Sequence, residues 1–84
     1  MKIKKDIALS DSGFVFNPSS GESFSTNGMG VELFNYIKEG KLFSEIRNII
    51  LEKYDTNEAT FEKDYQDFVA ILEYNHLLDT SSNE

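Results

Sequence analysis

The order of two hydrophobic periodicities along the chain restricts its fold more than any other feature. Short β-prone runs separated by turn signals fill the first 27 residues, and apolar residues at helical spacing follow to about residue 77. Strands that precede helices, rather than alternate with them, indicate an α+β fold whose helices pack on one face of an antiparallel sheet. With 84 residues, the chain is long enough for a single domain spanning residues 1–84.

The β-prone part predicts a three-stranded antiparallel meander, in which strands and turns alternate over residues 3–9, 11–13, 14–16, 17–21 and 22–26. Because side chains alternate along a strand, we expect Phe14, Phe16 and Phe24 to share one face. Ser23 and Ser25 then point to the opposite face. No β-prone run follows residue 26, so the last strand is expected at an edge of the sheet.

Three helices are predicted after these strands. The first begins at the N-cap Asn27 and ends at Gly40, and the second covers about residues 43–54. The third covers about residues 58–77, and its apolar line consists of Phe61, Tyr65, Phe68, Leu72 and His76. The last two helices and their short turn resemble the helix-turn-helix part of a winged helix. The polar residues 79–84 are expected to form a flexible tail.

The residue types present exclude several kinds of chemistry. The chain has no Cys and one His, so it has no disulfide, no thiolate metal site and no histidine cluster. Its longest apolar run, residues 68–72, is far shorter than the ~20 residues that cross a bilayer. The N-terminal residues lack the apolar stretch of a signal peptide, so we expect a cytoplasmic protein without membrane contact.

Sequence motifs for catalysis are also missing. Residues 28–30 place two glycines at a helix start, but they lack the third glycine of a dinucleotide site and the Lys of a P-loop. The His lies on the apolar side of a helix end, and nothing resembles a nucleophile elbow. The acidic residues of the last helix are typical of a solvated surface. The sequence therefore predicts a binding protein that is not an enzyme and uses no cofactor or metal.

The net charge of −7 falls entirely in residues 43–84, because the first 42 residues carry five basic and five acidic side chains. Nucleic-acid binding requires positive charge at the phosphates, so this distribution argues against a nucleic-acid partner. Two features favour a peptide or protein partner. The expected edge strand offers unpaired backbone groups, and Ile71 lies away from the core line of the last helix, beside Asp64 and Asn75.

Three short motifs share their order and spacing with a known family. They consist of Asn27, Gly30 and Leu33, then Gly40, Glu45 and Ile46, then Asp64, Tyr65, Phe68, Val69, Leu72, Leu77 and Leu78. Over about residues 3–78, the chain resembles the PqqD-like family. It departs from the family pattern at Thr26, where Leu is usual, at Leu42, where Ser or Thr often caps a helix, and at His76, where Gly is frequent.

The resemblance implies a peptide chaperone, also called a precursor-peptide recognition element. Such proteins hold the leader segment of a ribosomally made peptide and deliver it to a modifying enzyme, often a radical SAM enzyme. In the family, the leader adds as a strand to the third β-strand and lies against the third helix. Carried over by position, the peptide-binding residues are Glu22, Ser23, Phe24, Ser25, Thr26, Asp64, Asp67, Phe68, Ile71 and Asn75. Asp64 and Asp67 are expected to select Lys or Arg in the leader.

Two other functions stay open at this point. The same groove could pack on a partner protein, as in a regulatory or structural subunit that never binds a leader. The second alternative is a winged-helix DNA-binding protein, which the acidic last helix disfavours. An exposed strand edge can pair with its own copy, so both a monomer and a weak homodimer are compatible with the sequence.

Overall fold

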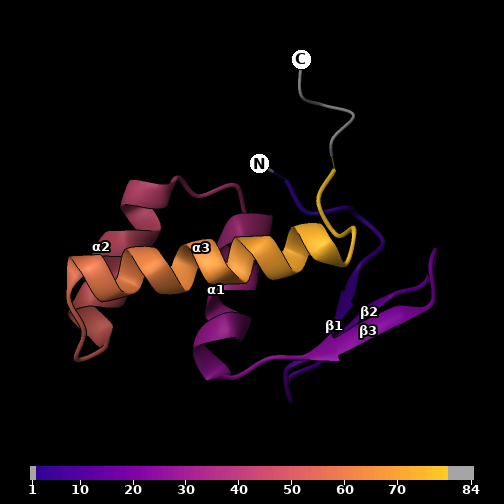
Figure 1. Cartoon of the computed structure of the whole chain (residues 1–84), viewed down its shortest axis with the longest axis horizontal. Helices are drawn as coiled ribbons and strands as arrows, with labels where there is room; N and C mark the ends of the chain where they lie inside the picture. Colours follow the sequence, from indigo (N-terminus) through magenta and orange to yellow (C-terminus); the bar gives the residue numbers. More distant parts are fainter. Residues whose placement is uncertain (1, 80–84) are drawn as a thin grey trace.

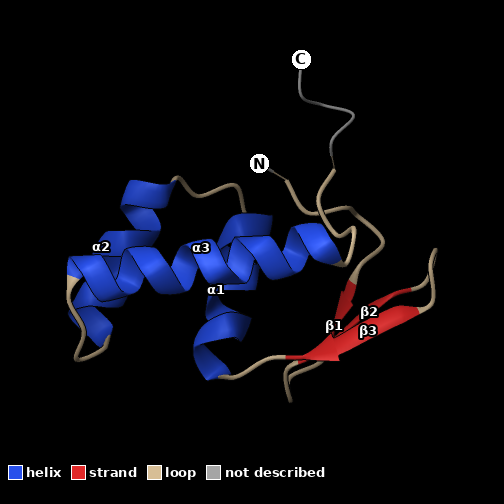
Figure 2. Cartoon of the chain, in the orientation of Figure 1, coloured by secondary structure: helices blue, strands red, loops and turns tan. Residues whose placement is uncertain are grey.

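The computed structural model describes residues 2–79 and contains a three-stranded antiparallel sheet followed by three helices. The elements are β1 (Ala8–Leu9), β2 (Phe14–Asn17), β3 (Glu22–Ser25), α1 (Gly28–Lys38), α2 (Phe43–Lys53) and α3 (Glu58–Tyr74). The strand order in the sheet is β1-β2-β3. This arrangement confirms the predicted α+β class, and the sheet lies near the C-terminal end of α3 (Figures 1 and 2).

The first helix begins at its predicted N-cap, and the second and third begin at residues 43 and 58 as predicted. The Asn27 side chain accepts a hydrogen bond from the Gly30 N–H, and Asn57 accepts one from Thr60, both at 2.8 Å. The end of α3 differs from the prediction, because the helix stops at Tyr74 and His76 has a φ of 58°. His76 is therefore not part of the apolar line. Its left-handed backbone explains why a Gly is common at this position in the family that the sequence resembles.

The first predicted strand is also shorter in the structure. Only Ala8–Leu9 pairs with β2, whereas Ile3 pairs with Leu78 beyond α3. The N–H of Asp79 donates to the Lys2 carbonyl at 2.8 Å, so the two ends of the described chain are held together. Asp79 was expected to open a flexible tail. The rest of that predicted tail, residues 80–84, lies outside the described residues.

The prediction that Phe14, Phe16 and Phe24 share one face is wrong. Val15 lies opposite Phe24 in the β2–β3 pair, and residues opposite each other in an antiparallel pair project to the same face. Val15 is fully buried and Phe24 packs against the core, whereas Phe14 and Phe16 are exposed. The outer face of the sheet therefore carries Phe14 and Phe16 together with the serines opposite them.

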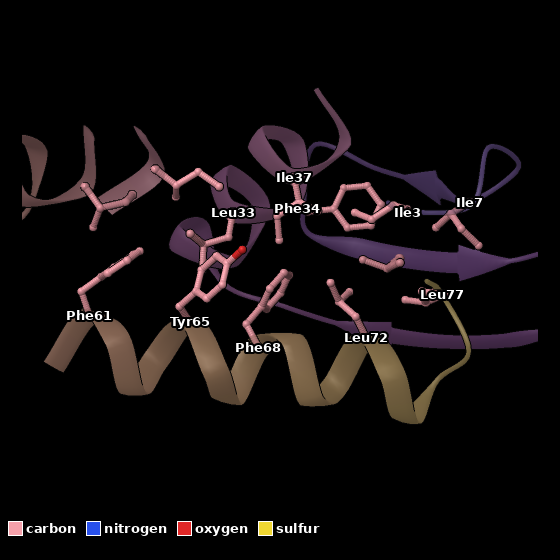
Figure 3. Packing of buried hydrophobic residues seen from close by; sticks show 13 residues of the cluster. Ile3, Ile7, Leu33, Phe34, Ile37, Phe61, Tyr65, Phe68, Leu72 and Leu77 are labelled. Carbon is pink, nitrogen blue, oxygen red and sulfur yellow. The ribbon is translucent and has the colours of Figure 1, made fainter. Parts of the chain in front are cut away.

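The hydrophobic core lies between α3, the other two helices and the inner face of the sheet. Figure 3 shows the apolar side chains of α3 pointing from that helix toward α1 and the strands. The buried residues of the core are Ile3, Ile7, Val15, Leu33, Phe34, Ile37, Ile46, Ile50, Phe61, Tyr65, Phe68, Leu72 and Leu77. Because α3 contributes four of these residues along its length, its position relative to the sheet is set by core packing.

A polar contact joins α1 to the end of α2. Both Tyr54 and Tyr36 donate hydroxyl hydrogen bonds to the Glu32 carboxylate, and the Lys53 ammonium lies 3.1 Å from it. The hydrogen bond from Tyr54, together with Lys53 and Tyr36, holds the pKa of Glu32 below its ordinary value. The contact orients α2 on α1. None of its residues belongs to β3.

Candidate functional site

The open edge of β3 is the first part of the candidate site. Within residues 2–79, β3 pairs with β2 on one side and has no strand on the other. The Thr26 N–H donates to the Gly13 carbonyl at 2.8 Å, just beyond the Phe14–Ser25 pair. Hydrogen-bonded and non-hydrogen-bonded pairs alternate along an antiparallel ladder. The N–H and C=O groups of Ser25 and Ser23 therefore point away from β2, toward the open edge.

A groove of about 270 Å³ continues from this edge and separates the end of β3 from α3. One wall comes from the β3–α1 junction and the other from α3. The lining residues are Thr26, Asn27, Met29, Gly30 and Leu33 on the first wall and Asp64, Asp67, Phe68 and Ile71 on the second. A ligand that adds to β3 would therefore contact apolar and acidic side chains in the same place.

The first wall depends on close packing between Gly30 and Thr26. A Cβ atom at Gly30 would lie 1.8 Å from the Thr26 hydroxyl oxygen, which is far inside van der Waals contact. Gly30 therefore lets the first turn of α1 approach the end of β3. The Asn27 side chain also fixes the direction of that first turn, because it accepts a hydrogen bond from the Gly30 N–H.

The second wall is formed by one flank of α3. Phe68 is buried, whereas Ile71 is 44% exposed although it is a large aliphatic residue. Asp64 and Asp67 are exposed on the same flank, and the Lys63 ammonium lies 2.9 Å from the Asp67 carboxylate. This flank consequently offers an apolar surface beside negative charge, both open to solvent.

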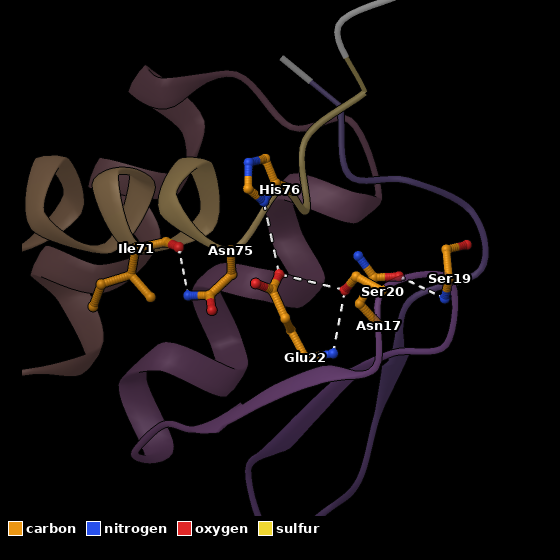
Figure 4. Close-up of polar contacts among 7 residues, drawn as sticks. All are labelled: Asn17, Ser19, Ser20, Glu22, Ile71, Asn75 and His76. Atoms are coloured by element: carbon orange, nitrogen blue, oxygen red, sulfur yellow. Dashed lines mark hydrogen bonds and ion pairs between the residues drawn. The ribbon is translucent and has the colours of Figure 1, made fainter.

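The start of β3 meets the residues after α3 through one side-chain contact. The imidazole Nδ1 of His76 lies 3.7 Å from the carboxylate of Glu22, which also binds the Ser20 hydroxyl (Figure 4). The Asn75 amide donates to the carbonyl of Ile71 at 2.9 Å. The His76–Glu22 contact joins the start of β3 to the residues after α3, and the Asn75 hydrogen bond lies within the last turn of the helix. The groove lies toward the other end of β3, beside Thr26.

Comparison with known proteins identifies the family. The sequence model of the family described as coenzyme PQQ synthesis protein D (PqqD) matches residues 13–78, which is most of the chain. The chain belongs to the PqqD family. No curated protein matches it.

A solved structure supports the PqqD assignment at the level of the fold. The structure of TbiB1 in complex with the TbiA(beta) leader peptide is similar to this chain, with a TM-score of 0.82 and 28% sequence identity. The match covers 94% of this chain and 95% of that one. The PqqD fold, with three strands followed by three helices, is therefore shared over nearly the whole length of both chains.

The structure brings together half of the residues that were predicted for a PqqD-like site. The groove is lined by five of them, namely Thr26, Asp64, Asp67, Phe68 and Ile71. Ser23 and Ser25 contribute outward-facing backbone groups instead. Glu22, Phe24 and Asn75 do not line the groove: Phe24 packs on the core, Glu22 contacts His76, and Asn75 bonds within the last turn of α3. Which of these residues touch a peptide stays a prediction.

Four lining residues were not predicted as part of the site: Asn27, Met29, Gly30 and Leu33. Three of these, all except Met29, belong to the first PqqD-like motif, and their spacing indicated a helix start rather than a groove wall. Within residues 2–79, no cluster of three or more His, Cys, Asp or Glu side chains could hold a metal ion. None of the helices described combines the length and the apolar character needed to cross a membrane.

Proposed function

We propose that this chain acts as a single PqqD-like peptide-binding domain in the cytoplasm. It binds the leader segment of a ribosomally made precursor peptide by strand addition to β3. It then presents the held peptide to a modifying enzyme, of the radical SAM type, and performs no catalysis itself. The proposal extends what the PqqD family and the leader-bound TbiB1 structure support for a chain of this fold.

The observation that carries the proposal is the open edge of β3 beside the α3 groove. Strand addition needs unpaired N–H and C=O groups in a row, and Ser23 and Ser25 direct theirs away from β2. It also needs a surface for the side chains of the added strand. The groove provides one, because Ile71 is exposed on the α3 wall and the partly exposed Met29 lines the opposite wall. Backbone pairing would supply affinity, and the groove would supply specificity.

A titration of the labelled chain, followed by amide NMR, tests the proposal. The ligands are synthetic leader segments of precursor peptides encoded beside this gene. We expect saturable shifts in residues 22–33 and 64–71, with little change in α2. Saturable binding with shifts confined to α2 or to the outer sheet face would contradict strand addition at β3. Absence of shifts with every leader segment would favour the alternative, a subunit that packs on a partner protein.

A pair of matched variants locates the contact on α3. Ile71→Asn removes an exposed apolar side chain from the groove, and Leu42→Asn removes one that is 66% exposed and lies outside it. Both variants should keep the fold, because neither side chain is buried. We expect Ile71→Asn to weaken leader binding about tenfold and Leu42→Asn to leave it unchanged. Equal effects of the two would place the leader elsewhere.

A further inference from the structure

The α3 wall of the groove carries negative charge that its own helix does not neutralise. Lys63 is the single basic residue in the sequence of α3, which also contains Glu58, Glu62, Asp64, Asp67 and Glu73. Lys63 pairs with Asp67, but both side chains are largely exposed and the pair is open to competition by another cation. In the described residues, the Asp64 side chain has no hydrogen bond or ion pair, and Asp64 lines the groove.

Apolar surface lies beside these carboxylates at a defined spacing. An α-helix rises about 1.5 Å per residue, so Asp67 and Ile71 are about 6 Å apart along α3. Alternate residues of a strand are about 6.6 Å apart and project to the same face. Two side chains at positions i and i+2 of an added strand therefore match the separation between a carboxylate and an apolar residue of this wall.

The register of β3 fixes which side chains of an added strand turn toward α3. Phe24 packs against the core, and Thr26, two residues later, lines the groove. Side chains of adjacent strands at equivalent positions project to the same face. Every second side chain of an added strand thus enters the groove, and those between them lie on the outer face with Ser23 and Ser25.

We propose that the groove selects leader segments in which a Lys or Arg lies two positions from an aliphatic or aromatic residue. The cation contacts Asp67 and Asp64, and the apolar side chain packs on Ile71 and Phe68. This inference rests on the proposed leader binding and adds the chemistry of the leader that is bound. A leader with Glu or Asp at the basic position is repelled by both carboxylates and by the net charge of −7.

Selection from a peptide library tests this specificity without choosing a leader sequence in advance. The probe is a fully randomised twelve-residue library displayed on phage and selected on the immobilised full chain. Sequences that lose binding to the Ser25→Pro variant are retained, since these depend on the β3 edge. We expect the retained sequences to be enriched in Lys or Arg two positions from Leu, Ile, Val, Phe or Tyr.

Charge-removing variants then assign the preference to the groove. Asp64→Asn combined with Asp67→Asn should abolish the basic preference but keep the apolar one. Glu62→Gln, which removes one negative charge from the same helix outside the groove, is the control. A synthetic copy of the most enriched peptide should bind about 3–10-fold more tightly than its Lys→Gln form. Raising the salt concentration should reduce this ratio, because exposed charges are screened.

The outcomes separate this inference from the function on which it rests. Edge-dependent peptides without any basic enrichment would overturn the charge selection and leave leader binding intact. The same holds if the basic preference survives in the Asp64→Asn, Asp67→Asn variant or is lost equally in Glu62→Gln. A library that yields no sequence sensitive to Ser25→Pro would contradict strand addition itself, and with it this inference.

Discussion

Ser25 and Phe14 lie opposite each other in the β2–β3 pair, and their side chains share the outer face of the sheet. Their backbone groups do not exchange hydrogen bonds, because the hydrogen-bonded pair is the next one, between Gly13 and Thr26. The side chain of Ser25 therefore faces solvent next to an exposed Phe, and its N–H faces the open edge. Changes at this position can remove an edge donor without disturbing the core.

Ser25→Pro should abolish peptide binding and keep the fold. Proline lacks the N–H that an added strand would use, and edge positions whose N–H faces solvent tolerate it. We expect at least about a tenfold loss of affinity for a bound leader segment, measured by calorimetry or NMR titration. Ser25→Ala, which retains the N–H, is the matched control and should bind like the wild type. Full affinity in the proline variant would exclude this edge as the binding site.

Most of the fold could be predicted from the sequence, because helix caps and periodicity are local signals. Asn27 caps its helix as expected, and the third helix begins at residue 58 as expected. The faces of β2 could not be predicted, since Phe14, Val15 and Phe16 are all apolar and show no alternation. The pairing of Val15 with Phe24 decides which side is buried, and that pairing is a tertiary property.

The two walls of the candidate site also differ in how far the sequence predicts them. The α3 wall could be predicted in part, because Ile71 departs visibly from the core line of its helix and is exposed as expected. The opposite wall could not, because it exists only where α1 approaches β3. Gly30 allows that approach by having no side chain, so the sequence shows a helix start and gives no sign of the Thr26 contact.

Gly30→Ala should destabilise the protein by about 1–3 kcal/mol and weaken peptide binding, because the new methyl group overlaps the Thr26 hydroxyl. Chemical denaturation measures the first effect and a peptide titration the second. Thr26→Ala removes the closest atom, so the double variant Thr26→Ala, Gly30→Ala should recover part of the lost stability. Gly28→Ala is a control, since a Cβ there meets no atom within 4 Å. A double variant no more stable than Gly30→Ala would rule out this contact as the cause.

Glu32 makes stability depend on pH in the acidic range. Its folded-state pKa lies below the ordinary 4.5, so its contribution is present above about pH 4.5 and is lost as the pH falls through the folded value. Glu32→Gln should lower the free energy of unfolding by about 1 kcal/mol at pH 7. The difference from the wild type should shrink as the pH falls below about 4.5, as urea denaturation at a series of pH values would show.

Glu62→Gln provides the comparison for this pH dependence, because the Glu62 side chain is exposed and has no hydrogen bond or ion pair in the described residues. That variant should change stability at pH 7 by less than about 0.5 kcal/mol. A difference between wild type and Glu32→Gln that stays constant as the pH falls from 7 to values well below 4.5 would mean that packing, rather than the carboxylate, is responsible.

Leu42→Ser should stabilise the start of α2. The N–H of Leu42 already donates to the Glu45 carboxylate at 2.8 Å, which is one half of a capping box. Leucine has no oxygen to accept the hydrogen bond of the Glu45 N–H, whereas a serine at this N-cap position has one. Because Leu42 is 66% exposed, its removal costs little burial. We expect a gain of about 1 kcal/mol in thermal or urea denaturation relative to Leu42→Ala, which cannot cap, and equal stability of the two would show that the serine does not complete the box.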